Sequence, residues 1–296
     1  MDVGSIISGS FRPIREWPVA VAVWGLIYMA ATIAMTFAMR PFVAGAWGAS
    51  LGGDPQARLA AAMGSLGNLL LVELGLLILF VILMTAAQRA VLRPADKGLF
   101  YLKLGMDELR MLALTIILVI LFYVGLVVAV GVLAVGAVAL GRAAAVVLMI
   151  VGIIALLALA IWLEVRLSLA FPLTLLRRRI IIGESWRLTR GRFWTLFGAY
   201  LVLFVVFLVF WSVVASLTAG SYLAEVMRAA GNPQRIQQAA QAQMARQFET
   251  IDLMKIVTWV LGAIIGGVSV AVAGAAVATA ARALASDREE IADTFA

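Results

Sequence analysis

The side chains best suited to bind an anion lie between two long apolar runs. The segment Arg177–Trp194 holds six arginines and one acid. Guanidinium groups bind phosphate through paired N–H donors, and tryptophan prefers the membrane interface. The segment therefore predicts contact with anionic lipid headgroups, although positive-inside topology alone would also place arginine here. The candidate headgroup ligands are Arg187, Arg190, Arg192, Trp186 and Trp194.

A single acid, Glu73, lies well inside an apolar run. It sits in the sequence LLLVELGLL, about two turns from the outer end of its predicted span. A charged carboxylate in hydrocarbon is costly, so such a residue is a functional candidate by default. Two interpretations are open: a structural carboxyl that reaches Asn68 or the outer interface, and an ion-coupling group of a transporter or channel.

Glu164 and Arg166 mark the other border of the membrane. At 1.5 Å per residue, Glu164 lies about 31 Å from the start of its span at Ala143. Arg166 can extend its side chain to the headgroups. Because Glu73 is predicted near the opposite face, these residues are not expected to form a pair at the midplane. Pro172 is predicted to kink or end the same helix.

Two absences in the composition argue against enzymatic chemistry. The chain contains no cysteine and no histidine, which removes thiolate ligands, the commonest metal ligand and the usual general base near neutral pH. No carboxylate pair, HExxH-type zinc motif or phosphate-cradling glycine loop is present. We therefore expect no catalytic residue, no metal site and no cofactor, and a protein that is not an enzyme.

The elements that position these residues are predicted to be membrane helices. The chain is 64% hydrophobic and 13% charged, against about 25% charged in soluble domains. Each apolar run is too long for a strand, so helices must satisfy the backbone in lipid. The sequence thus predicts an all-α integral membrane protein with six transmembrane helices. The six runs are Trp17–Met39, Leu66–Ala87, Met111–Leu140, Ala143–Leu163, Phe193–Leu217 and Leu253–Leu284.

Basic residues set the orientation of these spans. With the amino terminus inside, 16 Lys and Arg fall on the cytoplasmic side and 7 outside. The first run is longer than the apolar core of a signal peptide, which favours an uncleaved span. The net charge of +7 is concentrated in loops beside the membrane, which indicates anionic lipid rather than nucleic acid as a partner. We expect a bacterial inner-membrane protein with both termini in the cytoplasm.

A short basic, amphipathic lead-in precedes each odd-numbered span. The lead-ins are Ser5–Trp17, Leu99–Met111 and Ile182–Trp194. They predict three hairpins, each approached by a cytoplasmic interfacial helix. Any six-span protein with long cytoplasmic loops would show a similar layout. The predicted units of the single domain 1–296 are the hairpins 1–87, 88–176 and 177–284, followed by a short cytoplasmic tail at 285–296.

Two outer loops share a helix-start signal. Gly53-Asp54-Pro55-Gln56 in the first loop matches Gly231-Asn232-Pro233-Gln234 in the third. Asp or Asn at the N-cap followed by Pro at the first helical position predicts a helix start. The last span also carries small residues on one face, which predicts close helix packing. That face holds Gly262, Gly266, Ser269, Ala273, Ala276 and Ala280.

The run Arg166–Phe204 resembles the multi-span membrane region attached to some bacterial glycerophosphoryl diester phosphodiesterases, and stand-alone bacterial relatives of unknown function. The resemblance implies a six-span inner-membrane module. In the fused members the chemistry belongs to a separate soluble domain with metal-binding acids and histidines, so that activity is not carried over to a chain without histidine. The matching residues are Arg166, Leu169, Pro172, Glu184-Ser185-Trp186, Thr189-Arg190-Gly191 and Phe193-Trp194.

Together these patterns predict a non-enzymatic multi-pass membrane protein that organises anionic lipid or a protein partner at the cytoplasmic leaflet. The basic lead-ins would form its working surface. The alternative is a transporter or channel for a solute, which would use Glu73 and a cavity between hairpins.

Overall fold

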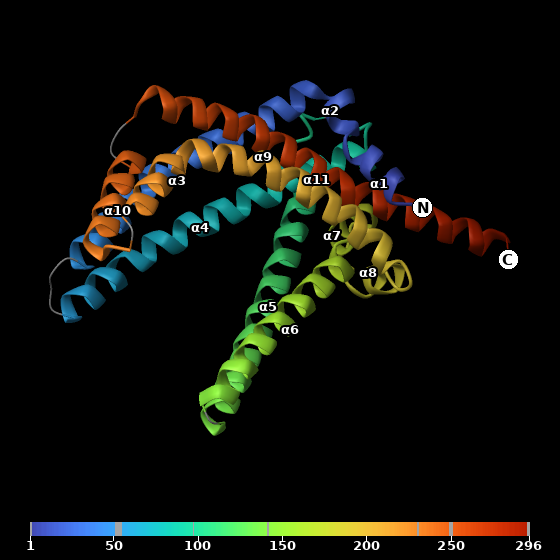
Figure 1. Ribbon diagram of the computed structural model, residues 1–296. Coiled ribbons are helices and arrows are strands. Elements are labelled where there is room, and N and C mark those ends of the chain that lie inside the picture. The colour runs from blue at the N-terminus through green and yellow to red at the C-terminus, as the bar shows by residue number, and fades with distance from the viewer. Residues whose placement is uncertain are drawn as a thin grey trace. The chain divides into compact units, whose positions relative to one another are not determined.

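The computed structural model describes residues 2–50, 55–96, 98–140, 142–229, 231–248 and 251–294, and the regular structure in these ranges is helical (Figure 1). The chain divides into two compact units. The first unit comprises Met1–Arg12, Met84–Leu201 and Ala273–Ala296, and the second comprises Pro13–Leu83 and Val202–Val272. The helices are α1 (Val3–Ser10), α2 (Arg12–Glu16), α3 (Pro18–Ser50), α4 (Pro55–Leu92), α5 (Met106–Ala139), α6 (Arg142–Leu167), α7 (Ala170–Arg177), α8 (Gly183–Leu188), α9 (Phe193–Arg228), α10 (Pro233–Phe248) and α11 (Leu253–Thr294).

Six helical stretches of the described chain are long and apolar enough to cross a membrane. Each overlaps one predicted span, so the expectation of an all-α multi-pass membrane protein is confirmed by the length and composition of the helices. The arrangement of these spans as three consecutive hairpins stays a prediction. The stretches are Pro18–Met39, Leu70–Leu92, Met106–Ala139, Ala143–Arg177, Phe193–Leu217 and Leu253–Ser286.

The three lead-ins differ from one another. The first contains α1 and α2, and the third contains α8. The prediction of a helix over Leu99–Met111 is wrong for its first half, because residues 99–105 form a non-helical turn, the first four residues of which are closed by a bridge between Leu99 and Leu102. Phe100 and Tyr101 have φ angles of 55° and 63° there, which a right-handed helix excludes. Only from Met106 does the chain become helical, as the start of α5.

Pro172 interrupts the fourth span, as predicted. Helix α6 ends at Leu167 and α7 begins at Ala170. Proline has no N–H to donate, and its ring clashes with the carbonyl four residues earlier, here that of Ser168. Beside the break, the Ser168 hydroxyl donates to the carbonyl of Val165 at 2.9 Å and lies within hydrogen-bond distance, 3.1 Å, of the Tyr200 hydroxyl. The break thus directs the chain from α6 into the short α7 beside the candidate site.

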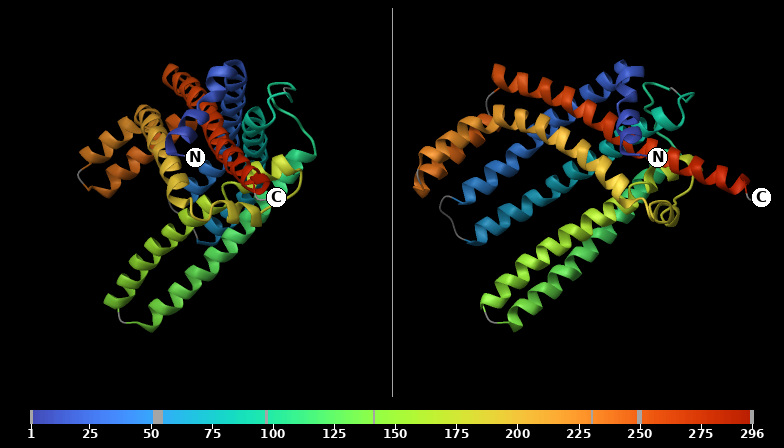
Figure 2. Two further views of the ribbon diagram at one scale, coloured as in Figure 1. Left: turned by 90° about the vertical axis from the view of Figure 1, so that its right-hand side faces the viewer. Right: turned by 45° about the vertical axis from the view of Figure 1, so that its right-hand side comes forward.

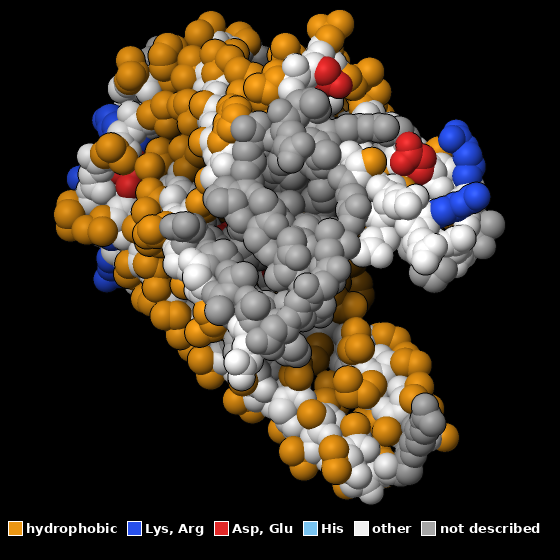
Figure 3. All heavy atoms as spheres, turned by 90° about the vertical axis from the view of Figure 1, so that its left-hand side faces the viewer, with side chains coloured by type: hydrophobic (Ala, Val, Ile, Leu, Met, Phe, Trp, Pro, Cys, Tyr) orange, Lys and Arg blue, Asp and Glu red, His pale blue; other side chains and the backbone are white. Residues whose placement is uncertain are grey.

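In the first unit, α5 and α6 lie side by side (Figures 1 and 2). A Cβ atom on Gly136 of α5 would lie 3.0 Å from Leu148, and one on Gly152 of α6 would lie 2.6 Å from Leu133. Both glycines therefore allow close approach of the two helices. Hydrophobic side chains cover this pair in the lower part of Figure 3. Such a surface fits lipid, because apolar groups at depth in a bilayer need no burial.

In the second unit, α3 and α11 approach through glycines. A Cβ atom on Gly267 would lie 2.8 Å from the Cα and N atoms of Gly25 and from the carbonyl oxygen of Val21. Gly266 next to it receives the ring of Tyr28. Of the residues predicted on the packing face, Gly266 makes such a close contact, whereas Gly267 was not assigned to that face. Gly262, also assigned to that face, is different, because a Cβ there would meet no described atom within 4 Å.

The predicted helix start at Gly231–Gln234 is confirmed at α10. The Asn232 side chain accepts hydrogen bonds from the backbone N–H groups of Gln234 at 3.0 Å and Arg235 at 3.3 Å, and the helix begins at Pro233. The matching residues Gly53 and Asp54 of the first loop lie outside the described residues, and α4 begins at the following Pro55.

Candidate anion-binding site

Arg89 is a buried charge near the end of α4, in the first unit. Its side chain is 1% exposed, and it pairs with Glu108 from the first turn of α5, which is 8% exposed. Arg89 Nη1 also donates to the carbonyl oxygen of Tyr101 at 2.6 Å. A charge in the protein interior must be paired and hydrogen-bonded to be tolerated. Arg89 therefore connects the end of α4, the following turn and the start of α5.

The backbone of the turn that accepts a hydrogen bond from Arg89 is strained. Phe100 and Tyr101 both lie in the left-handed region, which costs non-glycine residues about 1–2 kcal/mol each. The carbonyl that receives the Arg89 guanidinium belongs to Tyr101. Such strain persists only where surrounding contacts determine the conformation, and it concentrates at functional sites. At the end of the turn, Gly105 N–H donates to Glu108 Oε2 at 3.0 Å and fixes that carboxylate.

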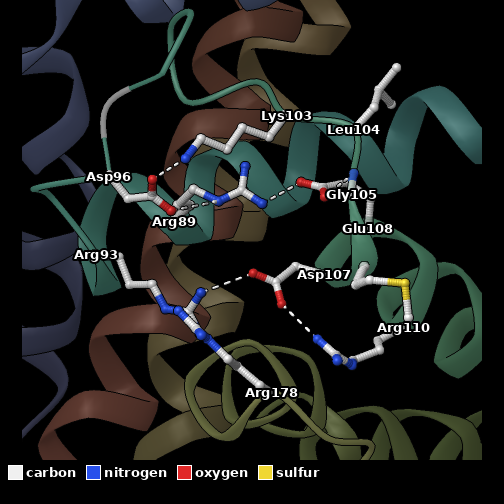
Figure 4. Close-up of a pocket in the computed structure, with 11 residues that line it drawn as sticks. Arg89, Arg93, Asp96, Lys103, Leu104, Gly105, Asp107, Glu108, Arg110 and Arg178 are labelled. Atoms are coloured by element: carbon white, nitrogen blue, oxygen red, sulfur yellow. Dashed lines mark hydrogen bonds and ion pairs between the residues drawn. The ribbon is translucent and has the colours of Figure 1, made fainter.

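A second group of ion pairs lies beside Arg89 (Figure 4). Asp107 accepts from Arg93 Nη1 at 2.9 Å and from Arg110 Nη1 at 3.0 Å. Arg93 Nη2 also donates to the carbonyl of Leu175 in α7. In the turn, Lys103 pairs with Asp96, completing a network that joins α4, α5 and α7.

These residues line a pocket of about 480 Å³ within the first unit (Figure 4). This volume falls within the range of about 300–1,000 Å³ typical of small-molecule sites. Five cationic and three anionic side chains line it, so it carries an excess of two positive charges. The lining residues are Arg89, Arg93, Asp96, Lys103, Leu104, Gly105, Met106, Asp107, Glu108, Arg110 and Arg178.

Arg178 differs from the other cations of this pocket. It follows the last residue of α7 and has φ 54° and ψ 29°, the left-handed conformation that ends many helices. Its side chain is exposed, and it forms no ion pair or hydrogen bond with any residue that the structure describes. The pocket thus has an uncompensated guanidinium at its rim.

Arg166, near the end of α6, contacts two tryptophan rings. Its Cζ atom is 5.4 Å from the centre of the Trp162 ring and 5.5 Å from that of Trp186 in α8. The two rings meet edge to face at 5.1 Å. A guanidinium over an aromatic face gains about 0.5–2 kcal/mol, more when it is shielded from water. This contact fixes α8 against the end of α6.

A hydrogen bond from a hydroxyl group to a backbone carbonyl also attaches α8 to the end of α6. Ser185 donates to the carbonyl oxygen of Arg166 at 2.8 Å, and Thr189 donates to the carbonyl of Ser185 at 2.9 Å. Gly191 then turns the chain with φ +81° before α9 begins. Arg166, Ser185, Trp186 and Thr189 all belong to the residue pattern on which the family resemblance rests. The structure brings them together, and their shared role is to hold α8 in place.

Of the predicted headgroup ligands, Trp186 and Arg187 belong to α8 and the others follow it in the chain. Arg187 and Arg190 are exposed, and Arg192 is half-buried. Trp194, the second residue of α9, is 78% exposed, whereas Trp186 is engaged with Arg166. We call Arg187, Arg190 and Trp194 the α8 surface. Two cations and an indole are thus available there to a ligand.

The two acidic candidates, Glu73 and Glu164, belong neither to the pocket beside Arg89 nor to the α8 surface. Glu164 is exposed near the end of α6, and Glu73 is exposed on the part of α4 that belongs to the second unit. Neither carboxylate forms a hydrogen bond or ion pair with a described residue. The side chain of Asn68, the proposed partner of Glu73, lies outside the described residues. Ion coupling at Glu73 therefore stays a prediction.

Sequence reasoning missed the pocket. Arg89, Arg93, Lys103 and Arg110 were counted only as charges that orient the spans. A signal was present, because Asp96, Asp107 and Glu108 place three of the 16 acids of the chain within 13 residues of one basic loop. Acids are unfavourable partners for an anionic membrane surface. Their presence indicates ion pairs that shape a site.

Asp96 makes part of this network sensitive to pH. The hydrogen bond from Lys103 holds the pKa of the Asp96 carboxyl below its ordinary value, and the charges of Lys103, Arg89 and Arg93 lower it further. A lowered folded-state pKa gives stability that is present above about pH 3.9 and is lost as pH falls through the folded-state pKa. We expect Asp96→Asn to unfold more readily than wild type at neutral pH, and the difference to close below about pH 3.9.

Chemical denaturation of the detergent-solubilised protein across a pH series checks this expectation. Lys103→Gln should weaken the pH dependence, since it removes the main cause of the low pKa of Asp96. The series runs from about pH 3 to about pH 7. An equal difference in the free energy of unfolding between wild type and Asp96→Asn at both ends of the series would contradict the expectation.

No group of three or more His, Cys, Asp and Glu side chains that could hold a metal occurs among the described residues. No family model, curated protein or solved structure matches the chain.

Proposed function

We propose that this protein is a non-enzymatic inner-membrane protein that binds anionic lipid headgroups at the cytoplasmic leaflet through the α8 surface. The observation that carries the proposal is the exposure of Arg187 on α8 and of Arg190 in the turn that follows it, because α8 is hydrogen-bonded to the end of the membrane-spanning helix α6. A basic residue near an anionic membrane contributes about 1 kcal/mol. The six-span module implied by the family resemblance is part of the same proposal.

The fixed position of α8 supports lipid binding over a purely topological role. Orientation of a span requires only positive charge in the loop, whatever its conformation. Here the contacts of the Arg166 guanidinium with Trp162 and Trp186, together with the Ser185 hydrogen bond, hold the helix in one place. Trp194 then presents an exposed indole at the start of the fifth span, where an amphipathic ring is favoured. Preorganised cations bind a headgroup with less loss of conformational entropy.

Removing the two exposed arginines tests the proposal. We expect Arg187→Ala/Arg190→Ala to lower the anionic lipid that co-purifies with the protein about tenfold, since about 2 kcal/mol of attraction is lost at about 1 kcal/mol per residue and part of it is recovered by neighbouring charges. Mass spectrometry of lipids from the purified protein measures the change. Zwitterionic lipid should be unaffected.

The matched control removes two exposed arginines from the second unit, Arg228 and Arg235, which line a separate pocket of about 330 Å³. Arg228→Ala/Arg235→Ala changes the net charge by the same amount. An equal fall in co-purified anionic lipid in both variants would show that lipid content depends only on net charge. That result would refute a lipid site at the α8 surface. Unchanged lipid in the Arg187→Ala/Arg190→Ala variant would refute it as well.

A further inference from the structure

We propose that the pocket between the end of α4, the start of α5 and Arg178 binds a doubly charged phosphate group, either the headgroup of a phosphate-monoester lipid or free phosphate. This site is separate from the α8 surface, and its argument does not depend on lipid binding there. The charge of the pocket, its open donors and the apolar side chains at its rim lead to the proposal.

Charge balance selects a dianion. The pocket lining carries two more positive than negative side chains. A phosphate monoester carries about −1.5 to −2 charge near pH 7 and three strong acceptor oxygens. A phosphodiester carries a single negative charge and would leave one cation uncompensated. The dianion alone brings the pocket close to neutrality.

Several donors around the pocket are open. Arg178 has no hydrogen bond or ion pair with a described residue, and Arg110 uses only Nη1, on Asp107. Inside the pocket, the buried Nε of Arg89 has no hydrogen-bond acceptor among the described residues, and the carboxylate oxygen paired with it, on Asp96, is 4.0 Å away. Planar guanidinium donors match phosphate oxygens in pairs. Arg178 and Arg110 offer open donors to a tetrahedral oxyanion, and the buried guanidinium of Arg89 adds positive charge behind them.

The carboxylates of the pocket offset three of the five cations and also hold the cations in place. Asp107 accepts from both Arg93 and Arg110, and Arg93 also donates to the Leu175 carbonyl. Glu108 is fixed by Arg89 and by the Gly105 N–H. Such supporting contacts limit the rotamers of binding residues, so less entropy is lost when a ligand binds.

Apolar side chains beside the pocket indicate how a lipid would reach it. Leu104 and Met106 line the pocket and are 84% and 62% exposed. In Figure 4 the Leu104 side chain points away from the ion pairs. The turn that carries Leu104 joins two membrane-spanning helices, so these side chains lie beside the interface. An apolar rim next to a cationic pocket suits a ligand with an anionic head and an acyl chain.

Short-chain lipids test the site on the full-length protein in detergent. We expect short-chain phosphatidic acid, a phosphate monoester, to bind more tightly than short-chain phosphatidylglycerol, a phosphodiester. Arg178→Asn should weaken phosphatidic acid binding about tenfold, since a charge-assisted contact is lost while asparagine still adopts the left-handed conformation. Arg178→Lys should retain most of the binding. Microscale thermophoresis or native mass spectrometry measures these affinities.

Arg179→Asn is the matched control, because Arg179 is the exposed neighbour of Arg178 and does not line the pocket. It should leave phosphatidic acid binding unchanged. Arg110→Gln is a second pocket variant, to be used if Arg178→Asn proves unstable. It should also weaken phosphatidic acid binding. Measurable but equal binding of the two lipids, or equal losses in Arg178→Asn and Arg179→Asn, would overturn the proposal.

Inorganic phosphate separates the two sources of the dianion. Displacement of phosphatidic acid by phosphate, or Arg178-dependent binding of phosphate alone, assigns the pocket to free phosphate. Arg178-dependent lipid binding without such competition assigns it to a lipid headgroup. Neither ligand binding in an Arg178-dependent way would overturn the site. The Arg187→Ala/Arg190→Ala variant should retain the pocket affinity, so failure of the α8 surface and failure of the pocket are distinguishable.

Discussion

Arg89→Met is expected to lower the free energy of unfolding by about 3–5 kcal/mol, the cost of removing one partner from a buried ion pair. Glu108, itself buried, would lose its cation, and the Tyr101 carbonyl would lose its 2.6 Å donor. The strained backbone of Phe100 and Tyr101 would then lack the contact that fixes it. The turn before α5 should become the first part of the protein to open.

Denaturant titration of the detergent-solubilised protein, followed by tryptophan fluorescence, measures this loss. Arg89→Met/Glu108→Gln should recover much of it, because no unpaired charge remains and glutamine can still accept from the Gly105 N–H. Arg179→Met serves as the control, since that arginine is exposed. A loss below about 1 kcal/mol in Arg89→Met would show that water or lipid compensates Glu108, and the buried pair would not be structural.

The six spans could be predicted from the sequence because lipid imposes a local rule. About 20 apolar residues in a row suffice to identify a transmembrane helix, whatever it packs against. Pro172 and Asn232 were equally local signals, and both mark helix boundaries in the structure. The lead-in at Leu99–Met111 was misjudged because its conformation depends on a distant side chain. The Tyr101 carbonyl is bonded to Arg89, twelve residues earlier in the chain.

The candidate site was harder to predict for the same reason. Arg187 and Arg190 were identified from an exposed, basic and aromatic segment, which is a local pattern. The pocket depends on pairs such as Arg93 with Leu175, which are 82 residues apart and meet only because α6 and α7 return the chain to the end of α4. In the sequence every arginine contributes the same positive charge. Only the fold distinguishes an arginine that forms ion pairs, such as Arg93, from one that forms none with a described residue, such as Arg178.

Within the second unit, Gly267→Leu is expected to destabilise the packing of α3 against α11 by about 1–3 kcal/mol, the usual cost of overpacking. A Cβ atom at this position would lie 2.8 Å from backbone atoms of Gly25 and from the carbonyl oxygen of Val21. Backbone atoms cannot rotate away as a side chain can, so the helices must separate. In a membrane, separated helices lose van der Waals contacts that lipid only partly replaces.

Gly262→Leu on the same helix is the matched control. A Cβ at Gly262 would meet no described atom within 4 Å, so the added side chain should be accommodated. Both variants gain the same four carbons and the same helix propensity, which favours leucine over glycine by about 0.5–1 kcal/mol. We therefore expect Gly262→Leu to be neutral or stabilising in detergent denaturation and Gly267→Leu to be destabilising. Equal midpoints for the two variants would show that close contact between α3 and α11 does not stabilise the second unit.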